Sequence, residues 1–314
     1  MKAQAFRDWL QALPRLTFRQ REQVEALLHE FAPERRTEGI LNRRAEEVRA
    51  CPHCYSAEVS LWGKDAGIQR YRCRACHKTF NALTGTPLSH LRRRDAWLTY
   101  GQALIDGLSV RKAATLSGIH RTTAFRWRHR MLRHPAEENG SELSTLVEAD
   151  ETYFLESFKG QRHLPRPARH RGGHAKKRGL SREQIPVLVA QDRQGNHFDA
   201  VLPRADENTL SCLLLQLLTP ETILCSDGAA AYRAVAKTAH IPHESLNIAA
   251  GIRVKLHVFH IQHVNAYDSR LKQWMDRFHG VATKYLPNYL GWRRLLEFHH
   301  NPLTPQAFLI HAMG

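Results

Sequence analysis

The 314-residue sequence lacks any stretch long and apolar enough to cross a lipid bilayer. Its longest apolar run, 210–218, is interrupted by Ser211 and Gln216, whereas a membrane-spanning helix needs about 20 apolar residues. The opening segment MKAQAFRDWLQALPRL alternates charged and apolar residues and lacks the continuous apolar core of a signal peptide. We therefore expect a protein that has no membrane partner and that stays in the cytoplasm.

Acidic residues are scarce relative to basic ones. The chain has 30 Asp and Glu against 46 Lys and Arg, a formal net charge of +16. Such a surplus predicts a polyanionic partner, with nucleic acid the first candidate and an anionic membrane surface the weaker second. Hydrophobic residues make up 42% of the chain, which is enough for two or three folded domains. No internal repeat is visible.

Cysteine is also rare, and four of the six cysteines form two C-x2-C pairs. Cys51 and Cys54 make the first pair, and Cys73 and Cys76 follow after eighteen intervening residues. In a reducing compartment such pairs bind metal in preference to forming disulfides. Four thiolates favour zinc in a closed tetrahedral site, so we predict one structural Zn²⁺ per chain in a zinc ribbon. The alternative is four unrelated buried cysteines.

Residues 109–133, SVRKAATLSGIHRTTAFRWRHRMLR, have the pattern of a helix-turn-helix. Ser109 can cap a helix that ends near Leu116, and 117–119 form a tight turn. The second helix opens with polar side chains that can reach base edges and continues with arginines for phosphates. The residues assigned to DNA here are Arg121, Thr122, Arg126, Arg128 and Arg130. The alternative is a basic surface helix on a small helical bundle.

From about residue 145, expected strands and helices alternate. Strands are expected at 146–154 and 222–227 and in a hairpin over 185–203 with its turn at 194–196, and helices at 207–218 and 229–239. This order predicts an α/β domain in which helices flank a mixed sheet. Between the first strand and the hairpin, segment 159–178 holds eight Lys or Arg and no acid. We expect it to bind a polyanion through residues such as Lys176, Lys177 and Arg178; the alternative is a solvated, mobile loop.

Two acids stand at the ends of expected buried strands. Asp150 is near the end of the first, and Asp227 ends TILCSD. Buried acids are costly unless they bind metal or each other, and in an RNase H-like sheet two such acids meet at one edge. Mg²⁺ or Mn²⁺, as two ions about 4 Å apart, suits this arrangement. The alternative for either Asp alone is a turn or cap residue. Because side chains alternate along a strand, Glu148 is expected on the same face as Asp150, where it could support the metal ligands or replace one of them. Glu151 is expected on the opposite face, toward solvent or a neighbouring domain.

A third set of polar residues shares one face of an expected helix in HVNAYDSRLKQWMDRF. Asn265, Asp268 and Lys272 are spaced at i, i+3 and i+7, while the apolar residues occupy a different, packing face. Any of the three could therefore reach a site formed by Asp150 and Asp227. Helix geometry does not choose between Asn265 and Asp268 as a ligand.

The order of these motifs resembles the ISXO-type group of bacterial insertion-sequence transposases. The likeness runs from the cysteine pairs and the helix-turn-helix through VEADETYF, the basic segment and SDGAAAY to HVN…RLKQWM…GVATKYLPNYLGW, and it covers nearly the whole chain from residue 48. Members belong to the DDE superfamily, in which this group can carry Asn as its third residue, followed by a Lys. The resemblance implies Asp150 and Asp227 as metal ligands, Asn265 in place of the usual Glu, and Lys272 as a basic residue that contacts the reactive phosphate or a terminal base.

The resemblance implies an enzyme that binds terminal inverted repeats in double-stranded DNA and catalyses metal-dependent cleavage and strand transfer into target DNA. It would assemble as a dimer or higher oligomer on DNA and associate with the bacterial nucleoid. The expected domains are a helical region (1–47), the zinc ribbon (48–90), the helix-turn-helix (91–135), an RNase H-like catalytic domain (145–300) and a C-terminal tail (301–314). The alternatives are a DNA-binding regulator derived from an inactive transposase and a zinc-ribbon nuclease.

Overall fold

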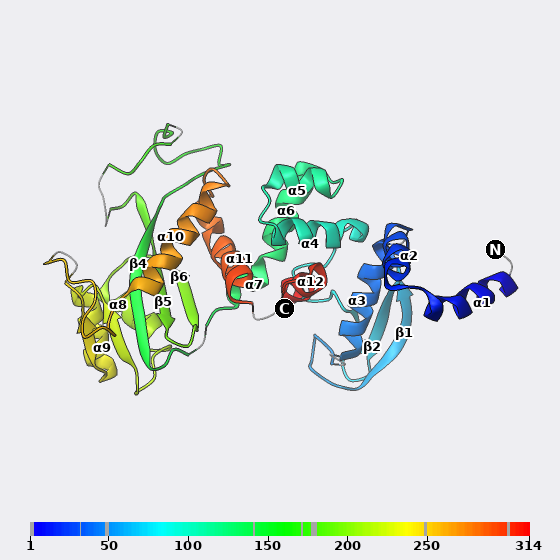
Figure 1. Cartoon of the computed structure of the whole chain (residues 1–314), viewed down its shortest axis with the longest axis horizontal. Coiled ribbons are helices and arrows are strands. Elements are labelled where there is room, and N and C mark those ends of the chain that lie inside the picture. Colours follow the sequence, from blue (N-terminus) through cyan, green and yellow to red (C-terminus); the bar gives the residue numbers. More distant parts are fainter. Residues whose placement is uncertain are drawn as a thin grey trace. The chain divides into compact units, whose positions relative to one another are not determined.

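The computed structural model describes residues 3–31, 33–47, 50–140, 142–170, 172–176, 181–247, 250–299 and 302–314. The chain divides into two compact units: Met1–Met131 together with Leu303–Gly314, and Leu132–Pro302 (Figure 1). Each unit is built from elements whose order follows the sequence patterns. Among the described residues, no helix combines the length and the apolar character needed to span a membrane.

The first unit begins with helices α1 (Ala3–Ala12), α2 (Phe18–Phe31) and α3 (Pro33–Glu47). A short 3-10 turn, η1 (Leu13–Arg15), separates α1 from α2. It contains Pro14, the residue expected to break the helical pattern, because proline cannot donate a helical hydrogen bond. Three antiparallel strands follow: β1 (Val59–Asp65), β2 (Ile68–Cys73) and β3 (Thr79–Asn81). Strands β1 and β2 lie between the two cysteine pairs, and β3 follows the second pair.

A small helical bundle completes the first unit. It contains the 3-10 turn η2 (Arg94–Ala96) and helices α4 (Trp97–Ile105), α5 (Val110–Leu116), α6 (Arg121–Met131) and α12 (Pro305–Met313). The side chain of Ser109 accepts a hydrogen bond from the Lys112 backbone at 3.4 Å, as its capping role predicted. Trp127 of α6 packs edge-on against Trp97 and Tyr100 of α4.

The C-terminal residues are not a tail. Residues 305–313 form α12, which packs against α4, and Phe308, Leu309 and Met313 are buried. The expectation of a tail over 301–314 is therefore wrong from residue 305 onward. The apolar composition of PQAFLIHAM, capped by the side chain of Thr304, favours a core helix.

The second unit is built on a five-stranded mixed sheet in the order β6-β5-β4-β7-β8. Its strands are β4 (Leu146–Leu155), β5 (Gln184–Asp192), β6 (His197–Val201), β7 (Ile223–Ser226) and β8 (His243–Ser245). Strands β4, β5 and β6 pair antiparallel, whereas β7 pairs parallel to β4 and β8 parallel to β7. The expected hairpin and its turn at 194–196 are confirmed; the short strand β8 was not expected.

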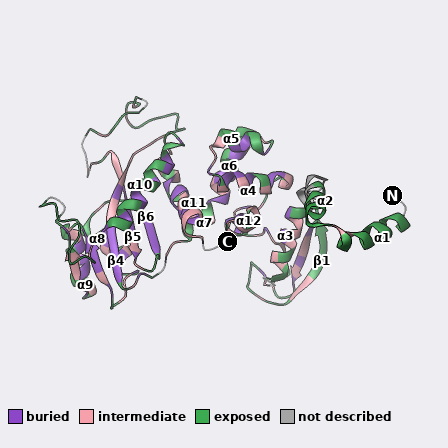
Figure 2. Ribbon diagram, in the orientation of Figure 1, coloured by how far each residue is buried: buried purple, intermediate pink, exposed green. Residues whose placement is uncertain are grey.

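Helices cover both faces of this sheet. The remaining elements of the second unit are α7 (Arg133–Glu137), α8 (Glu207–Leu214), α9 (Ala230–Ala239), α10 (Gln262–Asp276), η4 (Thr283–Tyr285) and α11 (Leu286–Phe298). One face, with Val147 and Ala149 of β4, packs its core against α8 and α9. On the other face α10 packs against β4 and β5 (Figure 1). Figure 2 shows strands β4, β5 and β6 mostly buried, as a two-sided sheet requires.

A buried polar network holds α10 and α11 to the edge strand β6. The Asp199 carboxylate accepts a hydrogen bond from the Tyr267 hydroxyl at 2.6 Å and forms an ion pair with Arg294. The same guanidinium donates to the carbonyls of Pro135 and Glu138 in and after α7. Because each charge is paired where it is buried, the network can fix helix positions without leaving an isolated charge.

Candidate carboxylate site and cysteine cluster

Asp150 and Asp227 lie level with each other on neighbouring strands. Strands β4 and β7 pair in parallel with Glu148 opposite Cys225, so two residues further along the register brings Asp150 opposite Asp227. Because side chains alternate along a strand, both acids share the face of Glu148 and Cys225, which is the face covered by α10. The Asp227 carboxylate is exposed and accepts the Ala229 backbone N–H at 2.9 Å.

The turn after Asp227 requires glycine. Gly228 has a φ of +84°, and a Cβ at this position would lie 3.0 Å from the Cβ of Ser245. Glycine therefore satisfies both the left-handed backbone and the close approach. This turn ends β7 directly after the carboxylate and leads into α9, so Asp227 stays at the rim of the sheet.

The burial of Asp150 and the charges around it favour the binding of a cation. Burial and the negative charge of Asp227 raise the pKa of Asp150 to about 6, against the opposing hydrogen bond from the Glu151 N–H. The positive charge of Lys272 lowers the pKa of Asp150. A divalent cation would relieve both the desolvation and the repulsion between the acids.

Helix α10 carries the three polar residues expected to face this site, in different environments. Asn265 and Lys272 are exposed, whereas Asp268 is buried and its Oδ1 has no hydrogen-bond partner among the described residues. Burial, with the negative charge of Asp150, raises the pKa of Asp268 to about 7. Asp150 thus has charge interactions with Asp227, Lys272 and Asp268.

Glu148 joins β4 to the first turn of α10. Its side chain is fully buried, and its Oε2 accepts the backbone N–H groups of His263 at 2.8 Å and Val264 at 3.3 Å. Its Oε1 lies 2.5 Å from Arg193 Nη1 and 3.2 Å from His260 Nδ1. The carboxylate therefore caps the positive end of the helix and is neutralised by a guanidinium.

Glu148 was expected to support the metal ligands or to replace one of them, and the structure argues against the replacement. Both of its oxygens are already occupied by α10, Arg193 and His263, so they are not free to act as a substitute ligand. Glu148, His260 and His263 also lie close enough to share a metal ion, but the Arg193 guanidinium already supplies the positive charge there. The two histidines of the motif HIQH, at the start of the helix, were not singled out from the sequence.

Replacing Glu148 with alanine should destabilise this unit and displace α10. The substitution removes the helix cap and leaves the guanidinium and amide donors unsatisfied, a loss of about 1–3 kcal/mol. Denaturant unfolding measures the change. Exposed Glu221, on the turn before β7, is the matched control: Glu221→Ala should change stability by less than about 0.5 kcal/mol. Equal stability of the two variants would contradict the capping role.

Glu151 points to the opposite face, as strand alternation predicted, but it does not face solvent or another domain. Its Oε1 accepts a hydrogen bond of 2.8 Å from the Tyr232 hydroxyl of α9 within the same unit. Burial raises the pKa of Glu151 to about 7, and Asp150 and Asp227 add to this rise. The expected outward orientation is corrected: an acidic side chain at this position is retained beside the core because Tyr232 supplies a donor.

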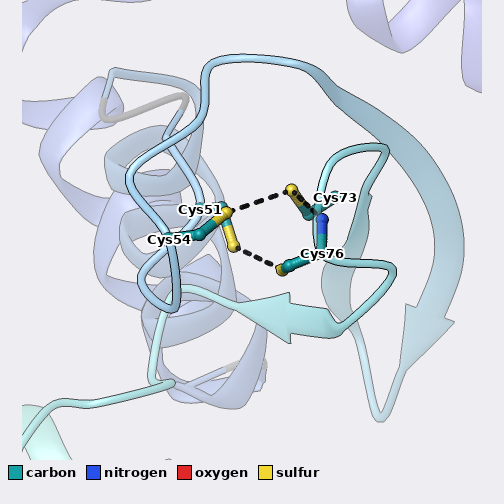
Figure 3. A group of neighbouring side chains, drawn as sticks. All are labelled: Cys51, Cys54, Cys73 and Cys76. Carbon is teal, nitrogen blue, oxygen red and sulfur yellow. Dashed lines mark hydrogen bonds between the residues drawn. The ribbon is translucent and has the colours of Figure 1, made fainter.

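The four cysteines of the two C-x2-C pairs come together in the first unit. Figure 3 shows Cys51 facing Cys76 and Cys54 facing Cys73, each pair of sulfurs 3.6 Å apart. All four Sγ atoms lie within 4.8 Å of one another, so they can surround a single metal ion. The Cys76 backbone N–H, 3.5 Å from Cys73 Sγ, lowers the pKa of the Cys73 thiol to about 7. The cluster is compatible with a zinc ribbon.

The arginines of α6 divide into exposed and structural side chains. Arg121 and Arg126, like Thr122, are exposed. Arg128 is fully buried and its Nη2 donates to the Leu108 carbonyl at 2.6 Å. Arg130 donates to the carbonyls of Pro87 and Ser89. The expectation that Arg128 and Arg130 contact phosphates is therefore corrected: both tie α6 to neighbouring loops. Helical spacing could not reveal this, because the partners are backbone carbonyls distant in sequence.

The basic segment after β4 is partly anchored. Lys159 Nζ donates to three carbonyls in the turn that follows α10, including Gly280 at 2.7 Å. Arg166 and Arg169 pair with Glu156 and Glu183. Of the three residues singled out for DNA, Lys176 is exposed, and its backbone N–H donates to the Glu183 carboxylate at 2.8 Å. Lys177 and Arg178 lie outside the described residues.

Comparison with known proteins places these features in a family context. Residues 142–294 match the ISXO2-like transposase domain. The chain is 28% identical over 266 residues to an uncharacterised protein in the transposable element ISH50 of Halobacterium salinarum, covering 83% of this chain and 89% of that protein. Two solved structures show weaker likeness: a simian T-cell lymphotropic virus intasome (13% identity, 66% and 70% of the chains, TM-score 0.30) and a Mos1 transpososome (12%, 63% and 75%, TM-score 0.24).

The second unit is thus a transposase domain. Its match begins just before β4 and ends within α11, so it includes Asp150, Asp227 and the whole of α10. The chain is similar to transposases of the ISXO2-like type over this part of its length, and to the ISH50 protein over most of its length.

Proposed function

We propose that this chain is an insertion-sequence transposase that binds terminal inverted repeats and catalyses metal-dependent DNA cleavage and strand transfer. The observation that carries the proposal is the level placement of Asp150 and Asp227 on the α10 face of an ISXO2-like transposase domain. The electrostatic repulsion between them in the absence of a cation supports a shared metal site.

An RNase H-like fold is part of this proposal, and the sheet topology supports it. Counted from β4, the strand order is 3-2-1-4-5, with the first three strands antiparallel and the last two parallel to the first. This arrangement brings the first and fourth strands together, and these are the strands that carry Asp150 and Asp227. The rim of the sheet at β4 and β7 is therefore the proposed place of the reaction.

Mg²⁺ or Mn²⁺, as two ions, would activate the attacking oxygen and stabilise the leaving oxygen of the phosphate. Asp150 and Asp227 would hold these ions by their carboxylates, the hard ligands that both prefer. The ammonium of Lys272 would contact the phosphate, because it repels a divalent cation and has no acceptor for it. Neither the cleavage nor the transfer requires a covalent bond to a Ser or Tyr of this chain.

The third ligand comes from α10, and two residues compete for the role. The family resemblance favours Asn265, which offers one neutral carbonyl oxygen. Burial and the unpaired Oδ1 of Asp268 support the alternative. Glu148 bonds the start of α10, and Lys159 bonds the turn that follows its last residue, so the helix runs along β4. A strand rises about 3.3 Å per residue and a helix about 1.5 Å, so the turn that contains Asp268 is level with Asp150.

Single substitutions in α10 distinguish the two candidates on a pre-cut DNA end. If Asn265 is the ligand, Asn265→Ala abolishes strand transfer and Asp268→Asn is tolerated, while Asn265→Glu can retain activity. If Asp268 is the ligand, this pattern inverts. Lys272→Ala should lower strand transfer in both cases without removing metal. Metal occupancy is followed in parallel; full strand transfer by both Asn265→Ala and Asp268→Asn would contradict a third ligand on α10.

The cysteine cluster and the helices α5 and α6 form the proposed DNA-reading part of the first unit. We propose that the cluster holds one structural Zn²⁺ and that α5, the following turn and α6 act as a helix-turn-helix. The exposed side chains of Arg121, Thr122 and Arg126 at the start of α6 support this role, because the N-terminal residues of a recognition helix contact base edges. The net charge of +16 supports additional contacts with phosphates.

Arg126 and Arg128 give opposite predictions despite lying two residues apart. Arg126→Ala should weaken binding to all DNA sequences and reduce the salt dependence of the affinity by about one counterion, because it removes one exposed phosphate contact. Arg128→Ala should instead lower the unfolding temperature, because it removes the bond to the Leu108 carbonyl from a buried position. Salt-dependent binding and thermal unfolding of both variants test this contrast; an unchanged salt slope for Arg126→Ala would contradict it.

The proposed function is tested with DNA from the flanks of the chain's own gene, where terminal inverted repeats are expected. Incubation with Mg²⁺ should expose a 3′-OH at the repeat and join it to a target plasmid, with a short target duplication after repair. Paired ends further predict self-association on DNA, seen as a complex with two ends. Tight binding without cleavage or joining would favour a DNA-binding regulator instead.

A further inference from the structure

A cavity of about 940 Å³ lies beside the candidate carboxylates in the second unit. Its lining comes from the end of β4, most of the basic segment up to His174, the second half of α10 and the residues that follow that helix. Tyr153, Phe158 and Lys272 are among the lining residues. The cavity thus begins where the strand that carries Asp150 leads into the basic segment.

The walls of this cavity are fixed by hydrogen bonds across the chain. The Ser157 N–H donates to Thr283 Oγ1 at 2.8 Å, and the Thr283 N–H donates to the Ser157 carbonyl at 2.9 Å. The ammonium of Lys159 binds the carbonyls of Phe278, His279 and Gly280 in the turn that follows α10. The space is therefore preformed among the described residues.

The lining offers flat apolar surfaces and hydrogen-bond donors together. The Arg166 guanidinium lies over the Phe158 ring, 5.3 Å from its centroid. Arg166 and Arg169 form ion pairs of 3.7 and 3.3 Å with Glu156 and Glu183. The donor atoms of these two pairs, Arg166 Nε and Arg169 Nη2, are buried and are not well aligned with their carboxylates for a hydrogen bond. Buried donors of this kind favour a ligand that brings acceptor oxygens or nitrogens.

Two lining residues connect the cavity to the carboxylates. The charge of Lys272 acts on Asp150 and lowers the pKa of that carboxyl. Burial, together with the charges of Glu151, Asp150 and Asp227, raises the pKa of the Tyr153 hydroxyl to about 12. Both side chains therefore lie within electrostatic range of the carboxylates and at the wall of the cavity. A ligand that filled the cavity would lie next to the phosphate bound at the carboxylates.

We propose that this cavity binds unpaired nucleotides at the DNA end, adjacent to the phosphate on which Asp150 and Asp227 act. The volume falls in the range of small-ligand sites, whereas a DNA duplex is far too wide to enter it. Aromatic surfaces with cationic donors are the usual means of binding single strands, because bases stack and phosphates accept hydrogen bonds. An unpaired nucleotide also gives access to the reacting phosphate. This inference rests on the proposed function.

The test uses a thymidine trinucleotide with a central 2-aminopurine and the full, zinc-loaded chain in a buffer without Mg²⁺ or Mn²⁺, so that no cleavage is needed. Binding should change the fluorescence of the probe, and Phe158→Ala should weaken it about tenfold, since stacking on an aromatic ring is lost. Phe18→Ala is the matched control: Phe18 is 76% exposed on α2 of the first unit, and its loss should leave the affinity unchanged. Circular dichroism of both variants checks that they are folded.

A second measurement keeps the inference testable if Phe158→Ala does not fold. A trinucleotide that carries 5-iodouracil should crosslink on illumination to Tyr153, Phe154 or Phe158, and peptide mapping identifies the residue. Crosslinks confined to the first unit, or displacement of the probe by inorganic phosphate alone, would overturn the inference. A protein that joins DNA ends but does not bind the trinucleotide would contradict only the cavity's role; one that binds it but cannot join ends would contradict only the proposed function.

Discussion

Asp150→Ala should abolish end cleavage and strand transfer while leaving the affinity for DNA nearly unchanged. The side chain would supply one of the two carboxylates that hold the metal, and metal-ion catalysis contributes several kcal/mol to the reaction. Since each 1.36 kcal/mol is a factor of ten in rate, we expect a loss of at least about a thousandfold. Cleavage of labelled end DNA in Mg²⁺ measures the rate, and a gel-shift titration measures the affinity.

The control for this variant is Glu207→Ala. Glu207 is an exposed acid at the start of α8 in the same unit, on the face of the sheet opposite α10. Its replacement removes the same amount of negative charge and should leave cleavage unchanged. If the Asp150→Ala variant still nicks end DNA in Mg²⁺, the catalytic assignment is wrong. If it loses DNA affinity as well, binding and catalysis are not separate as proposed.

Cys73→Ser should unfold the cysteine-containing part of the first unit and weaken DNA binding strongly. The four sulfurs converge within 4.8 Å, and zinc in such a site contributes about 10 kcal/mol or more to folding at neutral pH. Elemental analysis of the unmodified protein should give about one zinc per chain. Chelation of that zinc should reproduce the effect of the substitution, with loss of the β1–β3 strands seen by hydrogen exchange.

Cys212→Ser is the matched control, because Cys212 is exposed on α8 and lies outside the cluster. It should change neither the zinc content nor the affinity for DNA. A folded, DNA-binding protein that contains no zinc would contradict the structural-metal assignment.

Local sequence patterns were sufficient to predict the cysteine cluster and most of the secondary structure. The two C-x2-C spacings fix each pair of sulfurs within a short turn, so the approach of the pairs follows once β1 and β2 form a hairpin. The cap at Ser109 is equally local, because its side chain bonds a backbone group three residues away. Apolar strands such as 146–154 were identified because their length and their flanking turns left no helical alternative.

The sequence could not reveal contacts that depend on distant backbone groups. Glu148 was treated as a neighbour of the metal site because alternation places it on the same face as Asp150. The structure instead uses it to cap α10, 115 residues away. Similarly, Arg128 reads as an exposed member of a basic helix, and only the bundle shows that its guanidinium is buried against Leu108.

Helix geometry alone also left the third ligand undecided. Asn265 and Asp268 share a face at i and i+3, and either could reach a neighbouring strand. The distinction depends on how far α10 is shifted along β4, and the bonds of Glu148 and Lys159 at its two ends fix that shift. The recruitment of α12 into the first unit is a further long-range effect, since nothing in its sequence indicates which partner it packs against.

Mn²⁺ binding in complex with the DNA end tests the central claim most directly. Electron paramagnetic resonance of free Mn²⁺ counts the ions bound by the protein after the zinc site is filled. We predict that the unmodified chain binds up to two ions, that Asp150→Ala and Asp227→Ala each lose most of this binding, and that Glu207→Ala does not. Equal Mn²⁺ occupancy in all four proteins would contradict the assignment of these two carboxylates as the metal site of the transposase.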